Sequence, residues 1–214
     1  MEYLLILIPS LLEGTALTLK FFFITLVISL PLGMIGAVAR ISKFRPLNIF
    51  MQFYIWVFRG TPLLLQVLFV YFGLWLQFGI TLDQMTAALL AFILNYAAYL
   101  AEVFRSGIQS IDRGQFEAAD VLGLSRFQTM KTIIMPQMFK RVLPPVSNEV
   151  INLIKDTALI YAIGITELLR AAKIAAVRDF VFTPFLVAAV FYLIMTAVIQ
   201  LFFKWLEAKN DYYH

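Results

Sequence analysis

Two groups of polar side chains lie within stretches of sequence that are otherwise apolar. Asn95, Tyr99 and Glu102 are four and three residues apart, so on a helix they share one face. A second group repeats this spacing and has polar neighbours: Glu149, Asn152 and Asp156, with Asn148 and Lys155 beside them. Carboxylate, amide and hydroxyl groups arranged in this way bind polar solutes by hydrogen bonds and by charge. The chemistry that they indicate is recognition of a solute.

The charged members of these groups are costly in a membrane. An ionised side chain at the bilayer centre costs about 2.5 to 3.5 kcal/mol, so Glu102, Lys155 and Asp156 facing lipid would cost on the order of 8 to 10 kcal/mol together. We therefore expect them to line a wet cavity where a polar solute crosses, or to pair with each other. In the second case Lys155 or Glu102 neutralises a partner and only locks helices together. The candidate solute-binding residues are Asn95, Tyr99, Glu102, Asn152, Lys155, Asp156 and Thr157.

Arg59 is a further charged residue between apolar segments. Three roles are open to its guanidinium group: it neutralises a carboxylate, reaches the membrane interface, or contacts the carboxylate of a substrate. The sequence alone does not choose among them.

Catalytic and metal chemistry find no support in the sequence. There is no cysteine, which excludes disulfides and thiolate metal sites, and the single histidine is His214 at the end of the chain. No nucleophile with a neighbouring base is evident. We expect no enzyme activity, no catalytic residue, no metal and no cofactor in this chain.

The composition is that of a membrane protein. The chain has 214 residues, of which 62% are hydrophobic and only 14% charged, and its mean hydropathy is +0.86. Soluble domains carry roughly a quarter charged residues. The net charge of +4 is better interpreted by position than as a sign of nucleic-acid binding, because Lys and Arg favour cytoplasmic loops. We predict one all-α membrane domain over residues 1–214.

We expect about five membrane-spanning helices, with the N-terminus outside and the C-terminus inside the cell. The predicted spans cover residues 14–39, 47–78, 84–104, 146–165 and 181–203. Arg40, Lys43 and Arg45 follow the first span, and Lys204 and Lys209 follow the last, which places both of these ends in the cytoplasm. Residues 105–141 form the main cytoplasmic loop.

One predicted outer loop conflicts with this topology. The segment from Glu167 to Asp179 carries Arg170, Lys173 and Arg178, although basic residues normally collect on the inner side.

The first span has two further features. Leu4 to Ile8, closed by Pro9, is too short to cross and fits an interfacial helix or an extension of the first span. Met1 to Ile8 lacks a basic leader and a cleavage pattern, so we expect the first span itself to direct membrane insertion. Gly33, Gly36 and Ala37 form a small-residue patch that lets a neighbouring helix come close.

Two places predict interrupted helices. Gly60-Thr61-Pro62 predicts a kink with a new helical segment from Leu63. Pro144-Pro145 predicts that the segment from Val146 to Ile165 is a broken or tilted crossing.

A short helix is predicted within the cytoplasmic loop, from Glu117 to Gly123. Glu117 is expected in its first turn, and Gly123 in a left-handed C-terminal cap. Alanines allow close approach of another backbone, and apolar residues supply exposed anchors: Ala118 and Ala119, with Phe116, Val121 and Leu122. This is typical of a docking helix, although an ordinary amphipathic loop helix would have the same pattern.

These residues are similar to the conserved motif of a known family. Glu117-Ala118-Ala119, followed by Gly123, Ile133 and Pro136, resembles the cytoplasmic EAA signature of ABC importer permeases, with Met135 where Leu is more usual. Four other segments look like the polar amino acid branch, represented by histidine, glutamine and arginine importers: Arg59 to Leu64, Tyr99 to Arg105, Gly107 to Ile111, and Lys155 to Thr157. The likeness covers nearly the whole chain.

The resemblance implies a multi-pass protein of the bacterial inner membrane. Its expected partners are a second permease subunit, identical or homologous, two cytoplasmic ATPase subunits, an extracytoplasmic amino acid binding protein and membrane lipid. The chain has no GxxxxGK[ST] phosphate loop, so ATP and Mg are expected in the ATPase partner. The resemblance also implies the residues that contact the ATPase, which are Glu117, Ala118, Ala119, Leu122 and Gly123.

The leading hypothesis is therefore a permease subunit of an ATP-driven importer, which forms the pathway for a polar, basic amino acid by alternating access. A permease for another solute, such as an opine or an organic anion, remains an alternative. A passive channel is a third.

Overall fold

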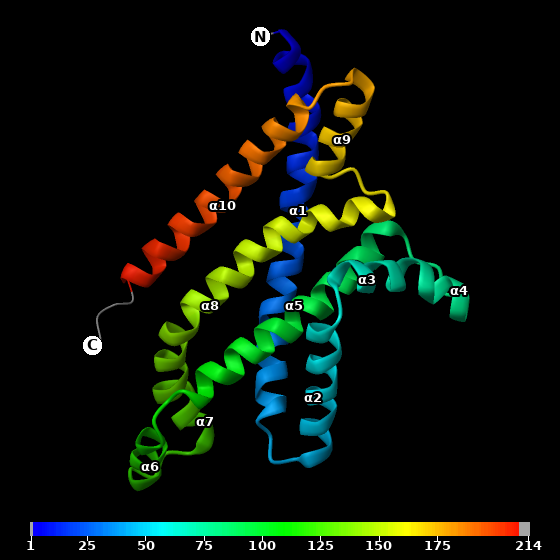
Figure 1. Ribbon diagram of the computed structural model, residues 1–214. Helices are drawn as coiled ribbons and strands as arrows, with labels where there is room; N and C mark the ends of the chain where they lie inside the picture. Colours follow the sequence, from blue (N-terminus) through cyan, green and yellow to red (C-terminus); the bar gives the residue numbers. More distant parts are fainter. Residues whose placement is uncertain (1, 210–214) are drawn as a thin grey trace.

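The computed structural model describes residues 2–209, and every regular element in that range is helical (Figure 1). The predicted all-helical class is therefore confirmed for this part of the chain. His214 lies outside the described residues.

The N-terminal half contains two long helices, α1 and α5, with a bent pair between them. Its elements are α1 (Glu2–Arg40), α2 (Arg45–Gly60), α3 (Leu63–Leu68), the π-helical turn η1 (Phe69–Gly73), α4 (Leu74–Phe78) and α5 (Gln84–Gln109). The C-terminal half contains α6 (Arg113–Val121), α7 (Arg126–Thr129), the π-helical turn η2 (Met130–Ile134), α8 (Met135–Asp156), the 3₁₀ helix η3 (Thr157–Ile163), α9 (Leu168–Asp179) and α10 (Thr183–Lys209).

Helix α1 is continuous over 39 residues. It passes through Pro9 without a break, so Leu4 to Ile8 extends the first helix and does not form a separate interfacial one. Leu7 and Leu11, on either side of this proline, are fully buried. Their packing holds the helix together where the proline removes a backbone hydrogen bond.

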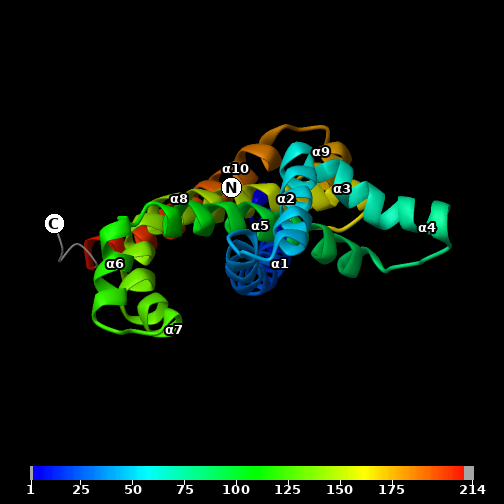
Figure 2. The same ribbon diagram turned by 90° about the horizontal axis from the view of Figure 1, so that it is seen from below.

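The predicted kink near Pro62 is confirmed. Helix α2 ends at Gly60, α3 begins at Leu63, and the two arms are bent by 105°. The second arm, from α3 to α4, extends to one side of the molecule, away from α6 and α7 (Figures 1 and 2).

Helix α5 is the centre of the fold, since α1, α2, α3 and α8 all contact it. Helix α1 crosses it at the predicted small-residue patch, where Gly33 lies against Leu100 and Gly36 against Ala101. The absence of side chains at both glycines allows this close approach. The predicted packing role of this patch is confirmed.

The prolines of α8 do not interrupt it. The helix continues through Pro144 and Pro145 to Asp156, because Val142, Leu143, Val146 and Ser147 around them are buried. The irregular backbone begins instead at Thr157, where η3 follows. The predicted break therefore lies about three turns further along the chain.

Three described helices are long and apolar enough to cross a membrane, namely α1, α5 and α10, and the bent pair α2 with α3–α4 would make a fourth. The segment predicted as another span, residues 146–165, consists of the end of α8 and η3. Its charged residues, Glu149, Lys155 and Asp156, explain why it is not among the apolar helices. The predicted loop 105–141 is largely helical, since it contains α6, α7 and the start of α8.

The packing of α1 on α5 predicts a large cost for one methyl group. In Gly33→Ala the new Cβ would lie 2.6 Å from Cβ of Leu100 and 3.2 Å from the backbone nitrogen of Ala101. We expect this overpacking to lower the stability of the purified complex by about 1–3 kcal/mol, seen as a lower midpoint of thermal unfolding in detergent.

Gly60→Ala is the matched control, because its Cβ would meet nothing within 4 Å. It should change stability by less than about 0.5 kcal/mol. Equal midpoints for the two variants would contradict the close helix contact.

Candidate functional site

A cavity of about 400 Å³ lies where α5, α8, η3 and the start of α3 meet. Its lining combines polar groups with a few apolar ones: Thr61, Pro62, Leu63, Asn95, Tyr96, Tyr99, Glu149, Asn152, Asp156 and Leu159. The two sequence groups that indicated solute binding therefore face each other across one space.

Asn95 joins this cavity to the bend between α2 and α3. Its side-chain nitrogen donates to the backbone oxygen of Phe58 and to Oε1 of Gln66, both at 3.0 Å. Gln66 in turn donates from Nε2 to Oγ1 of Thr61 at 2.7 Å. These bonds fix the position of the bend against α5, so the wall of the cavity is a connected polar network.

Tyr96 and Asp156 connect the two helices of the cavity. The Tyr96 hydroxyl on α5 donates to Oδ2 of Asp156 on α8 at 2.7 Å. Tyr96 is buried and Asp156 is half-buried. A hydrogen bond to an ionised carboxylate is stronger than a neutral one, so this contact holds the acid in a fixed position at the cavity wall.

Glu149 was on the predicted polar face of its helix but outside the set of candidate binding residues. It lines the cavity together with Asp156, so the lining holds two carboxylates and no Lys, Arg or His. The helical spacing of Glu149, Asn152 and Asp156 in the sequence already indicates that Glu149 shares a face with the other two. Tyr96 was not predicted, because nothing in the sequence distinguishes it from the other tyrosines of the predicted spans.

Arg59 lies beside the site. Its guanidinium carbon is 5.2 Å from the centre of the Tyr99 ring, in the geometry of a cation–π contact, and its side chain is exposed. Since Tyr99 is in the cavity lining, this places a cation next to the cavity.

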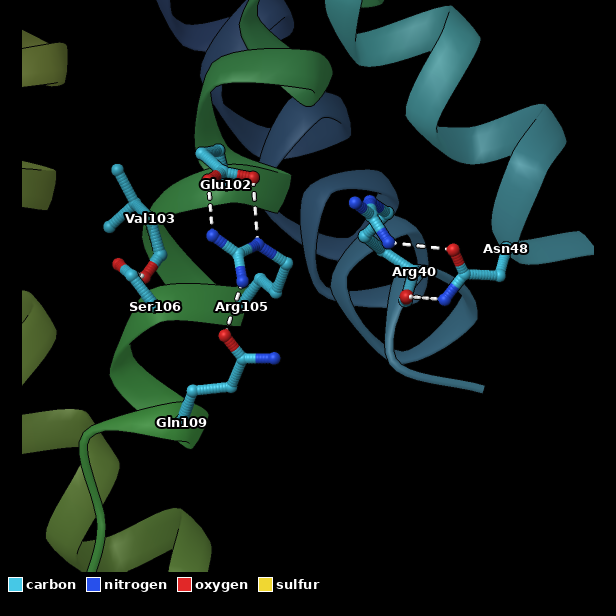
Figure 3. Close-up of polar contacts among 7 residues, drawn as sticks. All are labelled: Arg40, Asn48, Glu102, Val103, Arg105, Ser106 and Gln109. Carbon is cyan, nitrogen blue, oxygen red and sulfur yellow. Dashed lines mark hydrogen bonds and ion pairs between the residues drawn. The ribbon is translucent and has the colours of Figure 1, made fainter. Parts of the chain in front are cut away.

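Glu102 is not part of the cavity lining and pairs instead with Arg105 (Figure 3). Arg105 Nε donates to its Oε2 at 2.8 Å, and Arg105 Nη2 contacts Oε1. The pair belongs to one helix and neutralises the carboxylate locally without locking two helices together. Figure 3 also shows a separate hydrogen bond, in which Nη1 of Arg40 at the end of α1 donates to Oδ1 of Asn48 on α2 at 2.6 Å.

Lys155 and Thr157 also lie outside the cavity lining. Lys155 is exposed, and Thr157 is completely buried with its hydroxyl donating to the backbone oxygen of Ile154 at 2.7 Å. Four of the seven predicted residues therefore come together at the cavity: Asn95, Tyr99, Asn152 and Asp156.

The predicted docking helix is α6, and it begins earlier than expected. Asp112 starts it by accepting a hydrogen bond from the backbone nitrogen of Gly114 at 2.6 Å. Glu117 is therefore in the second turn, and the prediction that it occupies the first turn was wrong, because Asp112 provides the cap.

The end of α6 is as predicted. Gly123 has φ +70°, and the backbone nitrogen of Leu124 donates to the oxygen of Ala119 at 3.0 Å. This is a left-handed C-terminal cap, which favours glycine.

Large apolar side chains are exposed at the C-terminal end of α6, whereas Arg113, Glu117 and Asp120 are exposed along the rest of the helix. Val121 is 88% exposed and Leu122 is 73% exposed, and Ala118 is exposed as well. Ala119 is completely buried, and Phe116, expected as an exposed anchor, packs partly against the core. Large exposed apolar side chains at a helix end are characteristic of a protein contact.

In the sequence, α6 lies between α5 and α8, the two helices that carry most of the cavity lining. It follows α5 directly, and α7 and η2 connect it to α8. Gln137 on α8 donates to Gln115 on α6 at 3.1 Å, and Arg141 on α8 contacts Ser110 at the end of α5. Displacement of α6 would therefore act on α5 and α8 together.

Residues 29–212 match the family described as "binding-protein-dependent transport system inner membrane component". The chain is 40% identical over 212 residues to a putative glutamine transport system permease protein of Rickettsia conorii, with 97% of each chain covered. It is 40% identical over 203 residues to the arginine transport system permease protein of Bacillus subtilis, with 94% of this chain and 93% of that protein covered.

The fold is similar to a solved structure. A crystal structure of an amino acid ABC transporter with histidines contains a chain with TM-score 0.90 and 35% identity, and 97% of each chain is covered.

The cavity geometry predicts which positions water-soluble reagents reach. The chain has no cysteine, so single substitutions give unambiguous labelling. Asn152→Cys, in the cavity lining, should react with a charged maleimide at least about tenfold faster than Thr157→Cys, which replaces a completely buried residue. The measurement is the labelling rate of the solubilised protein. Similar rates at the two positions would contradict the open cavity.

Proposed function

Because the chain belongs to the family of binding-protein-dependent transport system inner membrane components, we propose that it carries a polar, basic amino acid across the bacterial inner membrane by alternating access. It is a permease subunit of an amino acid ABC transporter, as its relatives and the structural match indicate. The family implies partnership with a second permease, an ATPase and a binding protein.

The observation that carries the substrate proposal is the charge of the cavity. Its lining contains the carboxylates of Glu149 and Asp156 and no cationic side chain. A basic amino acid brings an α-ammonium and a cationic side chain, and each can form a charge-assisted hydrogen bond with a carboxylate. The relative named for arginine transport agrees with this choice.

The remaining polar groups suit the rest of the substrate. Asn152 and Tyr99 supply an amide and a hydroxyl that hydrogen-bond the α-carboxylate. Arg59 beside Tyr99 is the cation placed to receive that carboxylate at the cavity edge. Glu102 is left out of the proposed site because Arg105 already neutralises it.

In the proposed mechanism, α6 is the contact with the cytoplasmic ATPase, which binds ATP and Mg. Closure of two ATPase subunits would bring the α6 helices of two permease subunits together. Since α5 and α8 both carry the cavity and both connect to α6, their rotation would move the cavity opening from one side of the membrane to the other. The N-terminus and α9 then lie outside the cell.

The role of Asp156 is tested by Asp156→Asn. The substitution keeps an acceptor for the Tyr96 hydroxyl but removes the charge that binds the substrate ammonium. We expect uptake of a basic amino acid by proteoliposomes with the ATPase and binding protein to fall at least about tenfold, corresponding to about 1.4 kcal/mol.

Glu102→Gln is the matched control, because it removes a carboxylate outside the cavity. It should leave the apparent affinity for substrate unchanged. If the two variants behave alike, the proposed site is wrong. Competition by unlabelled glutamine, the substrate named for another relative, distinguishes a neutral substrate from a basic one.

The cap of α6 is tested by Gly123→Val and Gly123→Asn. A β-branched residue is strained at φ +70°, whereas asparagine tolerates this conformation. A Cβ added at Gly123 would meet no atom of a residue outside its own turn within 4 Å, so the effect comes from the backbone conformation. We expect Gly123→Val to lose most co-purification with the ATPase and Gly123→Asn to keep most of it, while both chains insert normally. Equal recovery would show that the left-handed cap is not needed for docking.

A further inference from the structure

The cationic side chains of α9 are unusual for their place in the fold. Arg170, Lys173 and Arg178 lie on a helix at the opposite end of the molecule from α6 and α7 (Figure 1). In the proposed topology this end is outside the cell, where basic residues are normally few. All three line an open cavity of about 670 Å³ between α9 and η3. The cavity is distinct from the one assigned to the substrate.

Helix α9 has two different faces. Its inner face is a stripe of buried alanines that packs against α1 and α10: Ala171, Ala172, Ala175 and Ala176. Its outer face carries the cations together with Ile174 and Val177, which are 50% and 63% exposed. Apolar groups bordered by cations are typical of a surface that contacts another protein.

This outer face is held rigidly. The carboxylate of Glu167 is completely buried and accepts the backbone N–H groups of Leu169 and Arg170 at 2.6 and 2.7 Å. The Tyr192 hydroxyl on α10 donates to the same carboxylate at 3.1 Å. The start of α9 is thus fixed to its neighbours, and a rigid surface loses little entropy when a partner binds.

Among the described residues, Arg178 is the only one of the three cations that forms an ion pair. Arg178 pairs with Asp179 at 2.7 Å, and this contact lowers the pKa of the Asp179 carboxyl to about 2. Lys173 lies 5.3 Å from the centre of the Tyr161 ring, and within residues 2–209 neither it nor Arg170 forms an ion pair. Two other acids are near: the completely buried Glu167 lies within electrostatic reach of Arg170, and Glu13 lines a neighbouring cavity together with Arg178. The face therefore keeps an excess of positive charge.

We propose that the cationic face of α9 is the docking surface for acidic side chains of the extracytoplasmic binding protein. This inference rests on the proposed function, which places α9 outside. The binding protein is the partner that we choose, because the family is binding-protein-dependent and this protein must contact the permease on the side opposite α6. Opposite charges would also steer the binding protein to the permease and increase its association rate.

The test uses the complete transporter with its binding protein, in nanodiscs of zwitterionic lipid. The double variant Arg170→Gln/Lys173→Glu removes the two cations of this face that form no ion pair within 4 Å in the described residues. We expect the binding-protein concentration that gives half-maximal ATPase stimulation to rise at least about tenfold at low salt, and to depend less on salt than in the wild type. ATPase activity without binding protein should not change. At saturating binding protein, uptake should recover, which shows that the variant is folded.

Lys204→Glu is the control, since it reverses a charge at the other end of α10 and should have no effect on this concentration. Equal half-maximal concentrations in the wild type and the double variant would overturn this inference but leave the proposed function intact. An effect that appears only when anionic lipid is added would assign the surface to membrane lipid and would also overturn it. Absence of stimulation in the wild type would overturn the proposed function and this inference with it.

Discussion

The structure depends on one constraint, which is that ionised groups inside a membrane protein need water or a partner. Asp156 meets this constraint through the Tyr96 hydroxyl and the cavity, whereas Glu102 meets it through Arg105 in its own helix. The two acids looked alike in the sequence, but their surroundings give them different roles. A carboxylate that faces open space remains available to bind a cation, and one that is already paired does not. The same reasoning separates Arg178, which is paired, from Lys173 on α9.

The position of α6 links this local chemistry to movement. Tyr99 in the cavity lies ten residues before the end of α5, or about 15 Å along the helix. On the other side, α8 starts after η2 and carries Glu149, Asn152 and Asp156 toward the same cavity. A rigid pair of helices transmits a displacement of its end to the residues along it, provided that the pair moves as a unit. The hydrogen bond between Tyr96 and Asp156 joins the pair where the cavity lies. In the proposed function, one helix pair thus serves both solute binding and its coupling to the ATPase.

Sequence alone predicted the helical class, the bend before Leu63, the glycine contact of α1 and the left-handed cap at Gly123. These features follow from short-range rules on glycine, proline and apolar periodicity. The candidate binding residues were predicted in part, because helical spacing shows which side chains share a face but not what that face meets. Thr157 shows this limit, since it follows the polar stripe of α8 and is nevertheless completely buried with its hydroxyl bonded to Ile154. The continuity of α8 through Pro144 was also hidden, because it depends on tertiary packing around the proline.

The central claim is that an ATPase bound at α6 changes which side of the membrane the cavity faces. Side-specific labelling of Asn152→Cys in membrane vesicles tests it most directly, with a membrane-impermeant reagent applied from one face at a time. The account predicts that trapping the ATPase in its nucleotide-bound, closed state slows labelling from the cytoplasmic face and accelerates labelling from the outer face. Labelling that stays the same from both faces, with or without trapped nucleotide, would contradict the account.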